Sequence, residues 1–261
     1  MICKWNRCRG FFRSGIKIQT MDFGILFDLV IKTILRYVIL TFLWTAIFYN
    51  QSSISVWDFQ SIHKYIAAMV FTTSLFSYPN IYFVSREIKT GNIVNALSKP
   101  YNYPLSIFMK NLGIVCFNFL LLSPLFFIYT AVFSSVSVKE LSLFLMSAVL
   151  GIITYILFDI NMALLTFWTE SDWGISLLKN AILFFFTGRL FPLDFLPSGI
   201  YLIFRRLPFA GMTYISILFF TGKEKTMLGF YILQLVWIII FFITMQILFH
   251  KLEKNVNLNG G

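Results

Sequence analysis

Residues 227–249, MLGFYILQLVWIIIFFITMQILF, contain no charged side chain. A helix needs about 20 mostly apolar residues to cross the hydrocarbon core of a bilayer, so this stretch is long enough to span a membrane. The rest of the chain has the same character, because 58% of its 261 residues are hydrophobic and only 12% are charged. An ordinary soluble domain has about 25% charged residues. The composition excludes a soluble enzyme and a disordered chain, and it predicts an integral membrane protein.

Five further apolar stretches precede this one, and together they predict an all-α, polytopic membrane protein with six transmembrane helices. These stretches are residues 37–50 (a full span if it begins near Ile31), 65–84, 112–133, 141–168 and 175–188. The predicted division of the chain is a basic cytoplasmic segment (1–36), a transmembrane domain (37–249) and a cytoplasmic tail (250–261).

The basic residues orient this bundle. With the N-terminus inside, fourteen of the 21 Lys and Arg residues fall on the inner side, so the positive-inside rule favours cytoplasmic N- and C-termini. The net charge of +10 is therefore explained by topology and does not indicate nucleic-acid binding. Five of the seven outer cations lie in residues 189–226, which this rule does not account for.

The predicted inner loop 84–110 contains a short amphipathic stretch. Val84, Ile88, Val94 and Leu97 fall near one helical face, and polar residues occupy the others. We therefore expect one short helix in the cytoplasmic interface, ended by Pro100.

Residues 189–226 are predicted to be more than a simple outer loop. Their apolar stretches, 200–204 and 209–220, are too short to span, so we expect extracellular re-entrant or interfacial helices that pack onto the bundle or line a path. An outer gate and a structural lid are equally compatible with this pattern. Asp194 is expected either to cap a helix or to pair with Arg189. The candidate gate residues are Arg189, Pro192, Asp194, Pro197 and Pro208.

Asp159 and Asn161 are candidate intramembrane polar residues in the fourth span. A carboxylate at this depth is costly and indicates a functional group, usually one of a pair. The alternative is that the long helix tilts and brings Asp159 near the inner interface, where it pairs with Lys179 or a partner chain.

Motifs for catalysis are missing from the sequence. The Gly222-Lys223 pair is followed by Glu224 and lacks the earlier glycine of a nucleotide-binding P-loop. Neither Cys3 nor Cys8 has a second ligand pair nearby, so no zinc site is expected. We predict no catalytic residue, no cofactor and no metal, and if ATP drives this protein another polypeptide must bind it.

Six short motifs occur in chain order, REIKTG (86–91), LSKP (97–100), ALLTFWTE (163–170), TGRLFPLDFLP (187–197), LPFA (207–210) and NGG (259–261). Together they resemble the permeases of ABC type-2 transporters, in particular their bacterial six-helix subfamily. Residues 1–20 depart from the pattern, and we expect them to be a dispensable extension before Met21.

The resemblance implies the membrane subunit of an ATP-driven exporter in the bacterial plasma membrane, working as a homodimer or with a related permease. It implies that the loop after the second span is a coupling helix that docks on a cytoplasmic ABC ATPase, and that the segment after the fifth span is an extracellular re-entrant hairpin. The cargo would be a hydrophobic or amphipathic drug, peptide or lipid. A secondary transporter or channel is the alternative, and it would need several ionisable groups at the membrane midplane. The residues implied in ATPase contact are Arg86, Glu87, Ile88, Lys89 and Gly91.

Overall fold

The protein is almost entirely helical. The computed structural model describes residues 5–21, 23–49, 53–54, 56–76, 80–99, 101–133, 136–224 and 227–259. These residues form twelve α-helices, one 3₁₀ helix and one antiparallel pair of strands in which Ile54 faces Trp57. The elements are α1 (Trp5–Met21), α2 (Phe23–Phe48), β1 (Ser53–Ile54), β2 (Trp57–Asp58), α3 (Phe59–Ser74), α4 (Asn80–Lys89), α5 (Asn92–Leu97), α6 (Tyr103–Phe133), α7 (Val138–Thr169), α8 (Asp172–Phe186), η1 (Leu193–Phe195), α9 (Ser198–Arg206), α10 (Pro208–Met212), α11 (Tyr214–Phe220) and α12 (Met227–Asn259).

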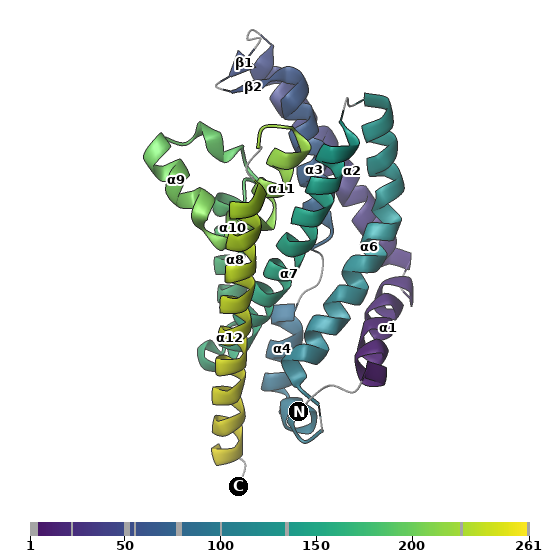
Figure 1. Cartoon of the computed structure of the whole chain (residues 1–261). Coiled ribbons are helices and arrows are strands. Elements are labelled where there is room, and N and C mark those ends of the chain that lie inside the picture. Colours follow the sequence, from purple (N-terminus) through teal and green to yellow (C-terminus); the bar gives the residue numbers. More distant parts are fainter. Residues whose placement is uncertain are drawn as a thin grey trace.

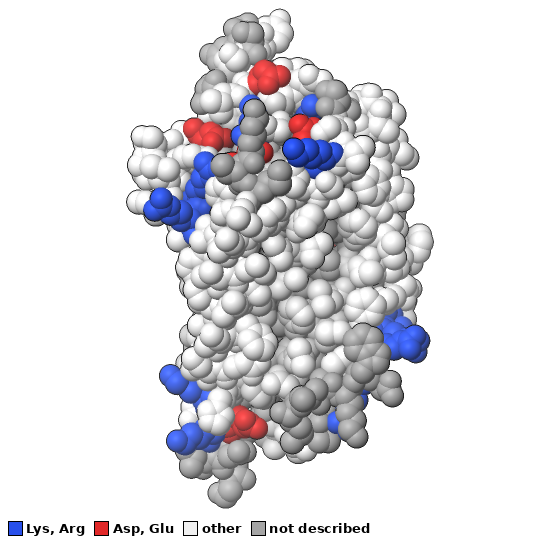
Figure 2. All heavy atoms as spheres, viewed as in Figure 1, with Lys and Arg blue, Asp and Glu red and all other residues white. Residues whose placement is uncertain are grey.

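The helices form an elongated bundle with charge at its two ends. The strands lie at one end, and α4 and the last turns of α12 lie at the other (Figure 1). On the face in view, Figure 2 shows Lys, Arg, Asp and Glu gathered toward these ends and an uncharged band between them. By length and composition α6, α7 and most of α12 can cross a membrane. The uncharged band is the surface that a bilayer core requires, because a charge at that depth is costly.

Helix α7 is the centre of the bundle, since it packs against α4, α8, α10, α11 and α12. The helices α7, α8 and α12 lie close to the stretches predicted for the fourth, fifth and sixth spans. Helix α6 begins at Tyr103 instead of residue 112, because the Asn102 side chain accepts a hydrogen bond from the Leu105 backbone and so starts the helix early. Helix α2 begins at Phe23 and runs through position 36, where we had placed the end of the basic segment.

The predicted continuous second span, 65–84, is wrong, because α3 ends at Ser74 and α4 begins at Asn80. Pro79 precedes α4 in the sequence, and proline cannot continue a helix that approaches from its N-terminal side. The N-terminal end of α3 is well defined, since the Asp58 side chain accepts a hydrogen bond from the backbone of Ser61. Hydrogen bonding with Ser61 also lowers the pKa of Asp58.

Helix α1 packs closely along α6. A Cβ atom added at Gly15 would lie 2.0 Å from the carbonyl oxygen of Lys110, and one added at Gly113 would lie 2.1 Å from that of Phe12. Small residues allow two helices to approach to this distance. The packing does not support our expectation that residues 1–20 are dispensable, since α1 is part of the folded bundle.

Replacement of Gly113 by leucine is expected to separate α1 from α6 and lower the free energy of unfolding by about 1–3 kcal/mol, the usual cost of overpacking. For a chain of this size, each kcal/mol corresponds to roughly 2–4 °C in Tm. Thermal unfolding in detergent micelles measures the change. Gly10→Leu is the matched control, because nothing lies within 4 Å of a Cβ atom at that position of α1. Equal Tm values for the two variants would show that the α1–α6 contact contributes nothing.

Candidate functional site

The predicted coupling helix is two helices. Gly91, at φ +70°, separates α4 from α5 in the left-handed region that glycine adopts without a Cβ clash. The break resets the helical phase, so Ile93 faces inward at 3% exposure while Val94 is 52% exposed. The predicted single helix with Val94 on its apolar face is therefore wrong. Pro100, which we expected to end this helix, lies outside the described residues, as do Gly260 and Gly261 of the last motif.

Two of the residues implied in ATPase contact fasten α4 to neighbouring helices. The Tyr103 hydroxyl, at the start of α6, donates a hydrogen bond to the Glu87 carboxylate. The Lys89 ammonium lies 2.8 Å from the carboxylate of Asp172 at the start of α8. Ile88 is half-buried. These three side chains therefore position the end of α4.

The remaining surface of this loop is exposed, and we call it the tip surface. It includes two of the implied contact residues, Arg86 and Gly91, and it lies at the end of the bundle opposite the strands (Figure 1). Its other exposed members are Thr90, Asn92, Val94, Asn95, Ser98 and Lys99.

A buried polar network lies deeper along α4. Asp159 of α7 is fully buried, and its carboxylate lies 2.8 Å from the ammonium of Lys179 on α8, whose side chain is 11% exposed. The Asn80 side chain of α4 donates to the second carboxylate oxygen of Asp159 at 2.5 Å. Asn80 and Asn111 exchange two amide hydrogen bonds at 3.0 Å. The structure places Asp159 against Lys179, one of the two partners that we had considered for it.

Asn161 belongs to a different contact. Its amide donates to the carbonyl oxygen of Phe241 on α12 at 3.0 Å and does not reach Asp159. Asn80 and Asn111 were missed by the sequence reasoning, although each is a polar residue beside or inside an apolar stretch. Their position in the sequence could have marked them as buried polar residues, but only the fold shows that the two side chains meet.

These contacts join α4 to α8 at two depths. At the end of the bundle opposite the strands the link is Lys89 with Asp172, and in the interior it passes from Asn80 through Asp159 to Lys179. A shift of α4 along its axis would therefore be transmitted to α8, since both links would have to move or break.

The segment after α8 packs onto the bundle, one of the two arrangements that we expected for it. Helices α10 and α11 are almost fully buried, against α7 and α3. Pro208 is the first residue of α10, Pro197 immediately precedes α9, and Pro192 precedes η1. Gln234 of α12 donates to the Gly211 carbonyl oxygen at 2.6 Å, so α12 also holds α10 in place.

Neither predicted role of Asp194 is found. Its carboxylate accepts a hydrogen bond from the indole of Trp57 at 3.2 Å and makes no cap in η1. Arg189 instead turns inward, with its guanidinium 5.6 Å from the centre of the Phe76 ring. Two other cations of this segment have local partners: Arg205 pairs with Glu224, and the ammonium of Lys223 lies 4.5 Å from the Trp57 ring.

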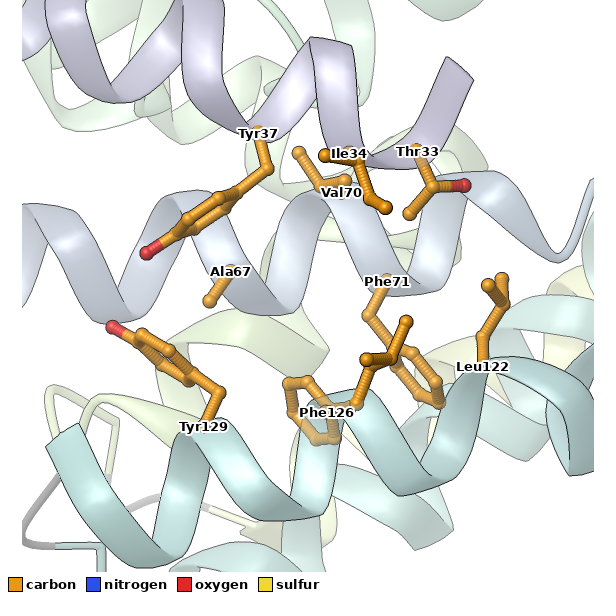
Figure 3. A pocket seen from close by; sticks show the side chains of 10 residues that line it. Thr33, Ile34, Tyr37, Ala67, Val70, Phe71, Leu122, Phe126 and Tyr129 are labelled. Carbon is orange, nitrogen blue, oxygen red and sulfur yellow. The ribbon is translucent and has the colours of Figure 1, made fainter. Parts of the chain in front are cut away.

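An apolar cavity of about 210 Å³ lies between α2, α3 and α6 (Figure 3). Phe71 and Phe126 stack within it, and the rings of Tyr37 and Tyr129 meet edge to face at its other end, with centroids 5.9 Å apart. Its walls are suited to a hydrocarbon chain or ring.

The comparison with known families agrees with this architecture. Residues 34–254 match the family model described as ABC-2 family transporter protein. Among curated proteins, none matches the sequence. The family match covers most of the chain, including α3 to α11 and the greater part of α2 and α12. The chain therefore belongs to the ABC-2 family of membrane transporter proteins.

Proposed function

We propose that this chain is the permease subunit of an ABC exporter whose ATP is hydrolysed by a separate cytoplasmic ATPase. In this proposal the six spans are α2, the broken pair α3–α4, α6, α7, α8 and α12. The first turn of α1, the tip surface and the last turns of α12 then lie in the cytoplasm, and the strands lie outside. The family match and the separation of charge to the two ends support this assignment.

The tip surface is the observation that carries the proposal. It lies at the end of a ten-residue helix whose other end enters the buried Asp159–Lys179 network. An ATPase that docks on Arg86, Gly91 and Val94 would therefore act on α4, which is connected to the interior. In this proposal Glu87 and Lys89 hold α4 in place.

The coupling mechanism follows from these connections. Closure of two ATPase subunits pushes α4, and the two links carry the displacement to α8 and the segment 189–224 that follows it. The result is a rigid-body switch between inward-facing and outward-facing states. Arg189, Pro192, Asp194, Pro197 and Pro208 belong to the outer part of this moving unit.

The permease would work as a homodimer or with a related permease, as the resemblance to ABC type-2 permeases implies. Its cargo would be hydrophobic or amphipathic, in keeping with the apolar cavity of Figure 3. The assembly lies in the bacterial plasma membrane.

Substitution of Val94 by aspartate, or Arg86 by glutamate, is expected to weaken ATPase binding about tenfold, because each change places an unpaired or reversed charge in the contact. Co-purification of a P-loop ATPase with the tagged permease measures binding, and ATP-dependent efflux from inverted vesicles measures coupling. Both residues are exposed, so insertion and Tm should not change.

Lys251→Glu is the matched control, since Lys251 is also an exposed cation near the cytoplasmic end but lies on α12. Normal ATPase binding by both tip variants would contradict the docking role. Efflux driven by an ion gradient in proteoliposomes without any ATPase would instead identify a secondary transporter.

A further inference from the structure

Two neighbouring cavities beside α2 share three cationic residues. A polar cavity of about 320 Å³ and a larger one of about 790 Å³ are both lined by Lys32, Arg36 and Arg189. The larger volume falls within the range of pockets that bind small molecules. We call the two together the cationic groove.

The cations of the groove have too few acidic partners. Lys32 pairs with Asp28, 2.7 Å away on the exposed side of α2. Arg36 donates to the neutral Thr73 hydroxyl at 3.1 Å and forms no ion pair with a described residue. The Nε and Nη2 atoms of Arg189 are buried and have no hydrogen-bond acceptor among the described residues. Buried charges in proteins are ordinarily paired, so the guanidinium group of Arg189 lacks an anion, and the exposed Arg36 stands beside it as a second cation.

The larger cavity also has an apolar wall. Besides the cations it is lined by hydrophobic side chains from α2, α3, α8 and the residues after α8, namely Leu35, Ile39, Leu40, Met69, Phe184 and Leu190. A free inorganic anion would gain nothing from this wall. An anion attached to a hydrocarbon chain would satisfy the cations and the wall together.

The groove lies where a transporter would need a binding site. Phe76, which lines the polar cavity, is in the break between α3 and α4, and Arg189 follows α8 directly. Interrupted helices near the membrane midplane commonly form the substrate sites of transporters. The groove therefore touches both elements that the proposed mechanism moves.

We propose that the cationic groove binds an amphiphile with an anionic headgroup, a phosphate or a carboxylate. Arg189 and Arg36 hold the headgroup, because the planar guanidinium group donates two parallel hydrogen bonds to such an anion. The hydrocarbon chain lies against the wall that includes Leu35, Met69 and Phe184. The role of the groove as a cargo site rests on the proposed export function, but the binding of the amphiphile does not.

The test uses the purified full-length permease in dodecyl maltoside, without ATPase. Isothermal titration with dodecyl phosphate is expected to give saturable binding, with weaker or no binding of dodecyltrimethylammonium and inorganic phosphate. Arg189→Gln and Arg36→Gln should each weaken the binding of dodecyl phosphate by about tenfold or more, equivalent to about 1.4 kcal/mol. Arg189→Lys should lose part of the affinity, since it keeps the charge without the planar fork.

Arg206→Gln is the matched control, because Arg206 is an exposed cation outside the groove and should leave the affinity unchanged. Tm of each variant shows that it is folded. Equal affinity of the wild type and both groove variants, or equal binding of the cationic amphiphile, would overturn the inference while leaving ATPase coupling intact. Competition by phosphatidylglycerol in nanodiscs would identify a bilayer lipid as the ligand, and ATP-driven efflux of dodecyl phosphate would identify a cargo.

Discussion

Lys179→Met is expected to lower the free energy of unfolding by about 3–5 kcal/mol, because it leaves the Asp159 carboxylate buried without its cation. Asp159 is fully buried, and among the described residues only the amide of Asn80 donates to its other oxygen. Methionine keeps most of the volume of lysine, so the loss of stability results from the removed charge and not from a cavity. Denaturant unfolding in detergent micelles, followed by tryptophan fluorescence, measures the change.

The double variant Lys179→Met with Asp159→Asn tests the pair as a unit. Removing both charges is expected to restore most of the lost stability, since replacing a buried ion pair by neutral groups is often nearly neutral. Lys251→Met is the control for loss of an exposed lysine and should change stability by less than about 0.5 kcal/mol. A loss below about 1 kcal/mol for Lys179→Met alone would mean that water reaches Asp159.

The uninterrupted apolar stretches were the most predictable part of the fold. Helices α7, α8 and α12 follow from hydropathy alone, because nothing within them competes with a helix. The six-span assignment remains a proposal, since α2 carries Asp28, Lys32 and Arg36, and α3 and α8 are each short.

The breaks were less predictable because they depend on single residues. Pro79 follows Tyr78 in a stretch that is apolar enough to be read as one span, and Gly91 resembles an ordinary helical glycine until its positive φ is known. The packing of α1 on α6 depends on Gly15 and Gly113, which lie almost a hundred residues apart. Hydropathy contains no information on which helices touch.

Partner choice was the least predictable feature of the site. Lys179 and a partner chain were the two candidates for Asp159, and Lys179 lies against it because α8 follows α7 through a tight turn and packs beside it. Arg189 and Asp194 are only five residues apart, yet they face different neighbours, Phe76 and Trp57. Proximity in sequence favours a pair, but the direction of each side chain is decided by tertiary packing.

The contact between α7 and α10, like that between α1 and α6, depends on a glycine that has no Cβ atom. A Cβ atom at Gly151 would lie 2.6 Å from the carbonyl oxygen of Met212 and 2.7 Å from that of Gly211. Both obstructing atoms are backbone, and α10 is also held by Gln234 through the Gly211 carbonyl. Neither helix can therefore relieve the clash by a side-chain rotation.

Gly151→Leu is expected to destabilise the protein by about 3 kcal/mol, at the upper end of the cost of overpacking, and to displace α10 and α11 from α7. Tm in detergent and limited proteolysis within 189–224 measure the two effects. Gly229→Leu is the matched control, because Gly229 lies on α12 with nothing within 4 Å of an added Cβ atom. If α10 and α11 transmit the motion of α8, the displaced segment should reduce ATP-dependent efflux while leaving ATPase binding at the tip surface intact. Wild-type Tm and protease resistance in Gly151→Leu would show that α10 does not approach α7 this closely.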